Sequence, residues 1–152
     1  MEDRNKSKDK LLLELGSLRK QVLELEITKA KKDKYKQIVD NANSIISLMN
    51  TKGIITFFNQ YAQRFFGFHE EEILGRSVVG TIVPEKDSSG KDLINMVNDI
   101  VKNPEHHFVN ENENMRRNGE LVRILWSNKA LIDKYGNIEE ILCIGNKIAK
   151  PE

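Results

Sequence analysis

The chain has 152 residues, which suffices for one ordinary domain and an appendage. Its 24 Lys and Arg nearly balance its 23 Asp and Glu, so bulk charge gives no argument for a nucleic-acid partner. The single cysteine, Cys143, excludes an internal disulfide and a CxxC metal site. A charged N-terminus and the lack of any stretch of about 20 apolar residues predict a cytoplasmic protein with no membrane insertion.

Residues 1–36 are predicted to form a helix with a short hydrophobic seam. Its apolar residues alternate in spacing between four and three, the heptad pattern of a coiled coil: Leu11, Leu15, Leu18, Val22 and Leu25. The seam is short, so the helix needs further support. Either it forms a dimeric coiled coil or it folds as an amphipathic helix onto its own domain. We adopt the homodimer, with these five residues as its interface.

Residues 37–149 carry the signals of an α+β domain, with 150–152 as a tail. Apolar patterns and turn signals predict five strands, at 44–49, 54–58, 107–115, 121–131 and 138–144. Between the second and third strand lie short helices from Asn59 and His69 and a longer helix over 93–101. Short connections require antiparallel pairing within each run of strands. We therefore expect one five-stranded antiparallel sheet with helices on one face.

The strand at 121–131 places apolar residues on both of its faces. Val122, Ile124 and Trp126 share one face, and Leu121 and Leu125 share the other. The second face therefore also needs a cover, for which the N-terminal helix or a partner subunit is the natural choice.

Six short motifs occur in a defined order along the domain. They are Asn50-Thr51-Lys52-Gly53-Ile54, Asn59, Phe66-Gly67-Phe68, Glu72-Ile73-Leu74-Gly75-Arg76, Arg116-Arg117-Asn118-Gly119 and Trp126. In this order they resemble the turns, helix ends and strand aromatic of the PAS family in its S-box form, over residues 37–149. The resemblance implies a PAS-like sheet behind a long N-terminal helix. It also implies a signal-transduction sensor that dimerises through a flanking helix and regulates an effector protein.

The end of the chain departs from this family. Where the family usually has Asp-Ile-Thr before an output helix, this sequence reads Lys147-Ile148-Ala149, and it stops at Glu152. We expect a fragment, a module that acts in trans on a kinase, cyclase or other regulator, or a module that signals through its N-terminal helix. A two-component system with a separate histidine kinase is one such setting.

The resemblance also bears on cofactors, none of which the sequence identifies. Val78 stands at the position of the reactive cysteine of flavin photoreceptors, which argues against cysteine-adduct flavin chemistry. Residues 91–103 contain no His, and His106 and His107 are expected at an exposed strand entry, which argues against haem and against a metal site. Cys143 is expected to be a small core residue.

The third strand contains an unusual alternation of amides and carboxylates. Asn110, Asn112 and Asn114 share one face, with Glu111 and Glu113 on the other. Asn is depleted in strands, so this triple needs an explanation. By resemblance the amides would face a pocket, where they suit a polar ligand. The alternative, slightly favoured on sequence alone, is an exposed edge strand whose charges discourage pairing with other chains.

Two functions remain open, and catalysis ranks last. The first is a ligand sensor with a pocket between the sheet and the longer helix. Its candidate residues are Ser47, Met49, Phe57, Met96, Ile100, Asn112, Asn114, Ile124 and Trp126. The second is a ligand-free module whose filled core presents a surface to a protein partner. An enzyme is not expected, because the sequence has no phosphate-binding loop, metal triad or nucleophile–base spacing.

Overall fold

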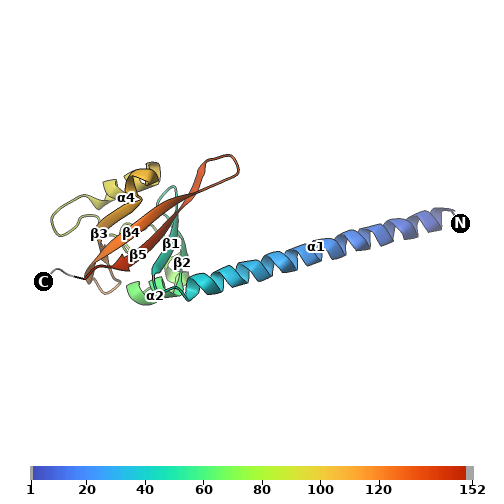
Figure 1. Ribbon diagram of the computed structural model, residues 1–152, viewed down its shortest axis with the longest axis horizontal. Helices are drawn as coiled ribbons and strands as arrows, with labels where there is room; N and C mark the ends of the chain where they lie inside the picture. The colour runs from blue at the N-terminus through green and yellow to red at the C-terminus, as the bar shows by residue number, and fades with distance from the viewer. Residues whose placement is uncertain (1, 150–152) are drawn as a thin grey trace. The chain divides into compact units, whose positions relative to one another are not determined.

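A computed structural model describes residues 2–149, and it describes side chains from residue 4 onward (Figure 1). The chain divides between Ile38 and Val39 into a helical unit and a domain. The tail assigned to 150–152 lies outside the described residues.

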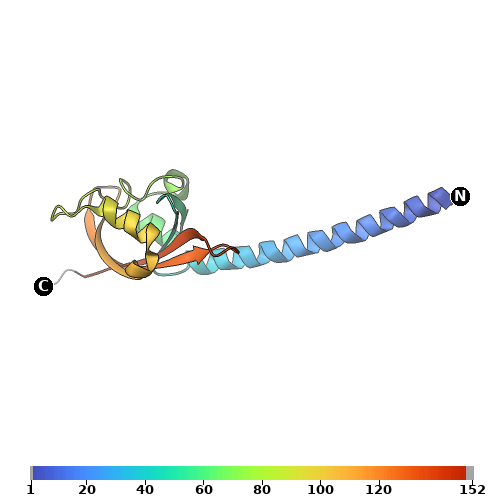
Figure 2. The ribbon, with the colours of Figure 1, turned by 90° about the horizontal axis from the view of Figure 1, so that it is seen from above.

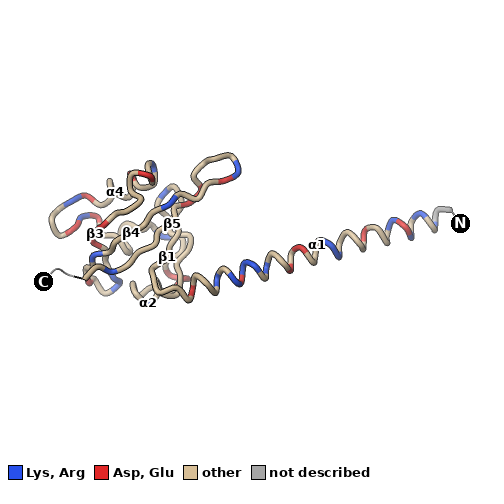
Figure 3. The backbone as a smooth tube through the Cα atoms, in the orientation of Figure 1, with Lys and Arg blue, Asp and Glu red and all other residues tan. Residues whose placement is uncertain are grey.

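The helical unit is formed by α1 (Glu2–Asp40), which extends beyond the predicted range of 1–36 at its C-terminal end. Every side chain from residue 4 to residue 38 is exposed, including the five seam residues. Charges of both signs are distributed along the helix (Figure 3). The apolar seam therefore lies exposed within an otherwise charged helix, and no side chain in this stretch is buried.

The domain contains one five-stranded sheet in the order β2-β1-β5-β4-β3, in which every neighbouring pair is antiparallel. The strands are β1 (Ile45–Asn50), β2 (Ile55–Phe58), β3 (Val109–Met115), β4 (Leu121–Ile132) and β5 (Ile138–Lys147). The last strand lies between β1 and β4, so the two ends of the domain meet in the middle of the sheet (Figure 1). The expected α+β architecture is confirmed.

The helices of the domain lie between β2 and β3 in the chain. They are α2 (Gln60–Phe66), α3 (Glu70–Ile73), α4 (Leu93–Lys102) and the 3-10 helix η1 (Pro104–His107). Figure 2 shows α4 lying over the curved sheet. The face of α4 that is buried carries four apolar residues, Leu93, Met96, Val97 and Ile100, at the three- and four-residue spacing of an amphipathic helix. The space that these side chains share with the sheet is the one that contains the site.

Asn59 connects three segments at the start of the domain. Its side chain is fully buried and makes four hydrogen bonds, which is the full capacity of an amide. Its Oδ1 accepts from the backbone N–H of Ala62, which caps α2, and of Ile46 in β1. Its Nδ2 donates to the carbonyl oxygens of Val39 and Ser44. The end of α1, the start of β1 and the start of α2 are therefore held by one residue.

Two local departures from the sequence prediction affect the site. The third strand was expected to begin at residue 107, but 104–107 form η1 because Pro104 suits the first turn of a helix and cannot donate to a sheet. In β2 the register shifts, so that Leu48 pairs with Phe57 while Met49 pairs with Ile55. This irregularity turns Phe57 to the face that Leu48 occupies, opposite to that of Met49.

The two faces of β4 differ as the alternation predicts. Val122, Ile124 and Trp126 are buried in the core. Leu121 and Leu125 on the opposite face are 43% and 45% exposed. The inner face therefore carries the core and the site, and the outer face retains accessible apolar surface.

Candidate functional site

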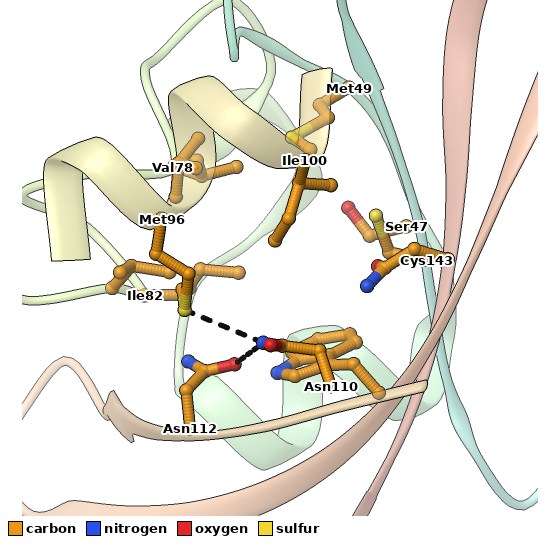
Figure 4. Close-up of a pocket in the computed structure, with 13 residues that line it drawn as sticks. Ser47, Met49, Val78, Ile82, Met96, Ile100, Asn110, Asn112 and Cys143 are labelled. Carbon is orange, nitrogen blue, oxygen red and sulfur yellow. Dashed lines mark hydrogen bonds between the residues drawn. The ribbon is translucent and has the colours of Figure 1, made fainter. Parts of the chain in front are cut away.

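A small cavity lies between α4 and the inner face of the sheet (Figure 4). Its volume is about 40 Å³, room for about three water molecules. The lining residues come from β1, α4, β3, β4, β5 and the connection before α4: Ser47, Met49, Val78, Ile82, Val83, Met96, Val97, Ile100, Asn110, Asn112, Trp126, Asn128 and Cys143. Figure 4 shows Ser47 and Cys143 on one side, Met96 and Ile82 on the other, and Asn110 below them.

Six of the nine candidates from the sequence line this cavity. They are Ser47, Met49, Met96, Ile100, Asn112 and Trp126. The other three do not. Phe57 is turned to the opposite face by the register shift in β2. Ile124 and Asn114 are fully buried in the core beside the cavity, where Asn114 holds the residues that do line it.

Seven lining residues were missed as pocket residues. Val78, Ile82, Val83 and Val97 contribute apolar wall, and Asn110, Asn128 and Cys143 contribute polar atoms and a thiol. Period-two alternation could have identified Asn128, because it continues the inward set of Val122, Ile124 and Trp126. Asn110 belonged to the amide face that was recognised. Nothing local distinguished Ile82 or Val83, which lie in an irregular connection.

The inward set of β3 forms a continuous chain of amides. Asn110 Nδ2 donates to Asn112 Oδ1 at 2.9 Å, and Asn112 Nδ2 donates to Asn114 Oδ1 at 3.0 Å. Asn114 also accepts from Trp126 Nε1 at 3.0 Å and donates to the carbonyl oxygen of Ile82 at 3.0 Å. Although β3 is an edge strand, Asn112 and Asn114 are buried. The exposed-edge interpretation is therefore wrong for these two amides.

A row of three polar residues runs across β1, β5 and β4. Ser47 is the cross-strand partner of Cys143, which is in turn the partner of Asn128. Burial raises the pKa of the Cys143 thiol to about 12, so it is neutral near pH 7 and a weak nucleophile. The row therefore contributes a hydroxyl, a thiol and an amide, all uncharged.

The end of α4 is tied to this row through η1. The ring Nε2 of His107 forms a hydrogen bond with Asp99 Oδ2 on α4, and the backbone carbonyl of His107 accepts from Asn128 Nδ2 at 2.9 Å. Hydrogen bonds from the side chains of His107 and Asn103 lower the pKa of Asp99. These contacts connect the C-terminal end of α4 to Asn128, which lines the cavity.

The close approach of Trp126 to the sheet depends on Gly145. A Cβ at this glycine would lie 2.7 Å from two atoms of the indole ring and 2.8 Å from Ile124. The absence of a side chain at Gly145 therefore lets Trp126 lie close to the sheet, where it borders the cavity and reaches Asn114.

In the described part of the chain, no group of three or more His, Cys, Asp and Glu could hold a metal ion. Among the described helices, none is long and apolar enough to cross a membrane.

Comparison with known proteins shows which family has this architecture. Residues 33–148 match a family model described as the PAS fold. No curated protein matches the chain. The PAS domain of an HTR-like protein from Haloarcula marismortui superposes with a TM-score of 0.63 at 17% identity, over 82% of this chain and 98% of that one.

Two other solved structures are similar. A PAS domain from a two-component sensor histidine kinase has a TM-score of 0.61 at 11% identity, over 80% of this chain and 99% of that one. The PAS domain of the quorum-sensing receptor RpfR from Cronobacter turicensis, solved in complex with C12:0, has a TM-score of 0.54 at 25% identity, over 73% and 99%. At 11% and 17% identity, likeness shows the fold alone.

Proposed function

Because the chain belongs to the PAS family of signalling sensory modules, we propose that it binds a small ligand in the α4 cavity and relays occupancy to a helical homodimer. The observation that carries this proposal is the cavity itself. It combines an apolar wall from α4 and residues 78–83 with amide groups from β3 and β4. Concave, mostly apolar sites with a few placed polar groups are typical of small-molecule binding.

A route from the cavity to α1 follows the chain. Ser47 lines the cavity in β1, and α1 ends at Asp40, a few residues earlier. The side chain of Asn59 binds the carbonyls of Val39 and Ser44 across that connection. A ligand that moves β1 therefore acts close to the end of α1. It shifts the dimer only if it binds one arrangement more tightly than the other.

The seam of α1 supports a homodimer. Its five residues, Leu11, Leu15, Leu18, Val22 and Leu25, are between 45% and 69% exposed in the single chain. In this heptad register Glu14 and Arg19 occupy the g and e positions that face each other across a parallel dimer. Two symmetric ion pairs of opposite charge favour the parallel orientation. Such a dimer would act in trans on a cytoplasmic effector, such as a histidine kinase, a cyclase or another regulator.

The test is an absorption spectrum and native mass spectrometry of the purified full chain and of Ser47→Leu. Ser47 forms no hydrogen bond through its hydroxyl in the described structure, so leucine fills the cavity without breaking one. We expect retained mass or a visible band in the wild type and its loss in Ser47→Leu. Ser17→Leu, on the exposed surface of α1, is the control and should retain the ligand. Equal retained mass in all three proteins contradicts binding in this cavity.

The small volume of the cavity favours a second candidate function. Room for about three water molecules also fits a ligand-free PAS module whose surface regulates an effector such as a histidine kinase. In that case Ser47→Leu should fold, dimerise and regulate the effector as the wild type does. Loss of regulation with dimerisation intact would favour the sensor.

A further inference from the structure

The three asparagines of β3 donate to one another in one direction only, from Asn110 to Asn112 to Asn114. This direction is set by the two other partners of Asn114, one of which can only donate a hydrogen bond and one of which can only accept. The indole N–H of Trp126 can only donate, so the atom it meets is Asn114 Oδ1. The carbonyl of Ile82 can only accept, so the atom it meets is Asn114 Nδ2. Exchanging the two amide atoms of Asn114 would place donor against donor and acceptor against acceptor.

This direction passes along the strand to Asn110. Since Asn114 presents an oxygen, Asn112 must donate to it and turn its own oxygen toward Asn110. Asn110 must then donate in turn, and its Nδ2 also contacts Met96 Sδ at 3.4 Å. Both hydrogens of Asn110 Nδ2 are thereby used. Its Oδ1 accepts no hydrogen bond from any residue in the described range.

Asn128, on the neighbouring strand β4, also has one side-chain oxygen without a donor. Its Nδ2 donates to the carbonyl oxygen of His107, which fixes the orientation of the amide. The side chain is only 4% exposed, and within residues 2–149 no donor reaches its Oδ1. Asn110 and Asn128 thus both line the cavity, from two neighbouring strands, and each has one side-chain oxygen that accepts no hydrogen bond within residues 2–149.

The lining contains no charged side chain. Ser47 contributes an uncharged hydroxyl and Cys143 a neutral thiol, and apart from the amides the remaining wall is aliphatic, aromatic or thioether. An ion placed here would lose its hydration without meeting an opposite charge, which is strongly unfavourable. A molecule that only accepts hydrogen bonds could accept from the Ser47 hydroxyl but would leave both amide oxygens unpaired.

We propose, on the basis of the function proposed above, that the ligand is a small uncharged molecule that donates hydrogen bonds through N–H or O–H and carries an apolar body. The donors bind Asn110 Oδ1 and Asn128 Oδ1. The apolar body lies against Ile82, Met96 and Ile100. Met49 and Met96 provide flexible walls that can adapt to its size. Carboxylates are rejected, and ligands that only accept hydrogen bonds bind more weakly because they leave both amide oxygens unpaired.

The experiment is a titration of the full chain, labelled with 15N, with two matched pairs of probes. Pyrrole and furan are five-membered rings of similar size, of which only pyrrole donates a hydrogen bond. Butyramide and butyrate have the same shape, but butyrate is charged and has no donor. Binding is read from the side-chain amide signals of Asn110, Asn112 and Asn128 and from the indole signal of Trp126, the single tryptophan.

We expect pyrrole to bind about fivefold more tightly than furan, the effect of about one neutral hydrogen bond, and butyramide to bind while butyrate does not. Asn110→Leu should reduce the preference for pyrrole over furan and retain furan binding. Asn98→Leu is the control, since Asn98 is exposed on α4, and it should keep the preference.

The outcomes separate the two proposals. If furan binds as tightly as pyrrole, or butyrate as tightly as butyramide, the cavity binds ligands but the assigned polarity is wrong. If Asn110→Leu keeps the full preference for pyrrole, the amide chain does not select the ligand and the inference is overturned. If none of the four probes shifts the cavity signals, the ligand-binding function and the inference both fail.

Discussion

α1 and the domain behind it gain their stability from different sources. All side chains of α1 from residue 4 to residue 38 are exposed, and its apolar residues form a seam with no cover in the single chain. The domain buries an apolar core and fixes its first segments through the four hydrogen bonds of Asn59. Association and folding should therefore be separable by mutation. Substitutions in the seam should change association alone, and substitutions in the core should change the stability of the domain.

The largest effect is expected from Leu18→Lys. In the proposed dimer it places a charge in the middle of the seam twice and removes two leucines that the interface would bury, so the dissociation constant should rise roughly a hundredfold or more. The midpoint of domain unfolding should not change. Analytical ultracentrifugation and circular dichroism measure the two effects. Leu13→Lys is the control, because Leu13 is 77% exposed and lies off the seam. A Leu18→Lys dimer that persists at micromolar concentration would contradict the seam assignment.

Asn59→Ala is expected to affect the domain most strongly. It removes four hydrogen bonds and leaves buried partners unsatisfied, which should lower the free energy of unfolding by about 3 kcal/mol. Asn98→Ala removes an exposed asparagine from α4 and should leave stability nearly unchanged. Urea unfolding of both variants measures the difference. Equal midpoints for the two would show that the Asn59 contacts contribute nothing.

Gly145→Ala tests the support of the cavity. A methyl group there would overlap Trp126 and Ile124, so the domain should lose about 2 kcal/mol of stability and the indole should move. Trp126 fluorescence reports the movement without interference, because the chain has one tryptophan. Gly16→Ala is the matched control, since a Cβ at Gly16 meets nothing within 4 Å. It should stabilise the α1 helix by about 1 kcal/mol. An unchanged emission spectrum in Gly145→Ala would be evidence against the close packing.

A substitution that tests the parallel orientation of the proposed dimer should have a smaller effect on association. In a parallel dimer Glu14→Arg replaces two attractions with two repulsions, which should weaken association by about 1 kcal/mol, or roughly fivefold. Adding Arg19→Glu should restore it. Sedimentation equilibrium of the single and double variants measures this. If the double variant associates no better than Glu14→Arg, the parallel arrangement is wrong.

The smallest effect on stability is expected from the contact between Asp99 of α4 and His107 of η1. The pKa of Asp99 is lowered from its ordinary value of 3.8 in the folded state, so its contribution to stability is present above pH 3.8 and is lost as the pH falls through the lowered pKa. Asp99→Asn should therefore be slightly less stable than the wild type at pH 7, and the difference should shrink toward pH 3. Thermal unfolding across that range checks it. A difference that grows on acidification would refute the assignment.

Most of the fold could be predicted because its signals are local. The heptad spacing, the hairpin turn at Asn118-Gly119 and the alternation of β4 each depend on neighbours in the chain, and each segment folded as its pattern indicates. The local rules failed at two places: Pro104 placed residues 104–107 in η1 and delayed the start of β3, and a backbone irregularity changed the facing of β2. Phe57 was expected to face inward, and one register shift in β2 moved it to the other face.

By itself the sequence determined that β3 has an amide face and a carboxylate face, but not which face is buried. That depended on the register between β3 and β4, which pairs Asn112 with Ile124 and Asn114 with Val122 and so places both amides on the face that packs against the core. Likewise Ser47, Cys143 and Asn128 are far apart in the chain and meet because β5 lies between β1 and β4. Hydrophobic periodicity is a local property that any one strand carries, whereas a cavity exists only between elements that tertiary packing brings together.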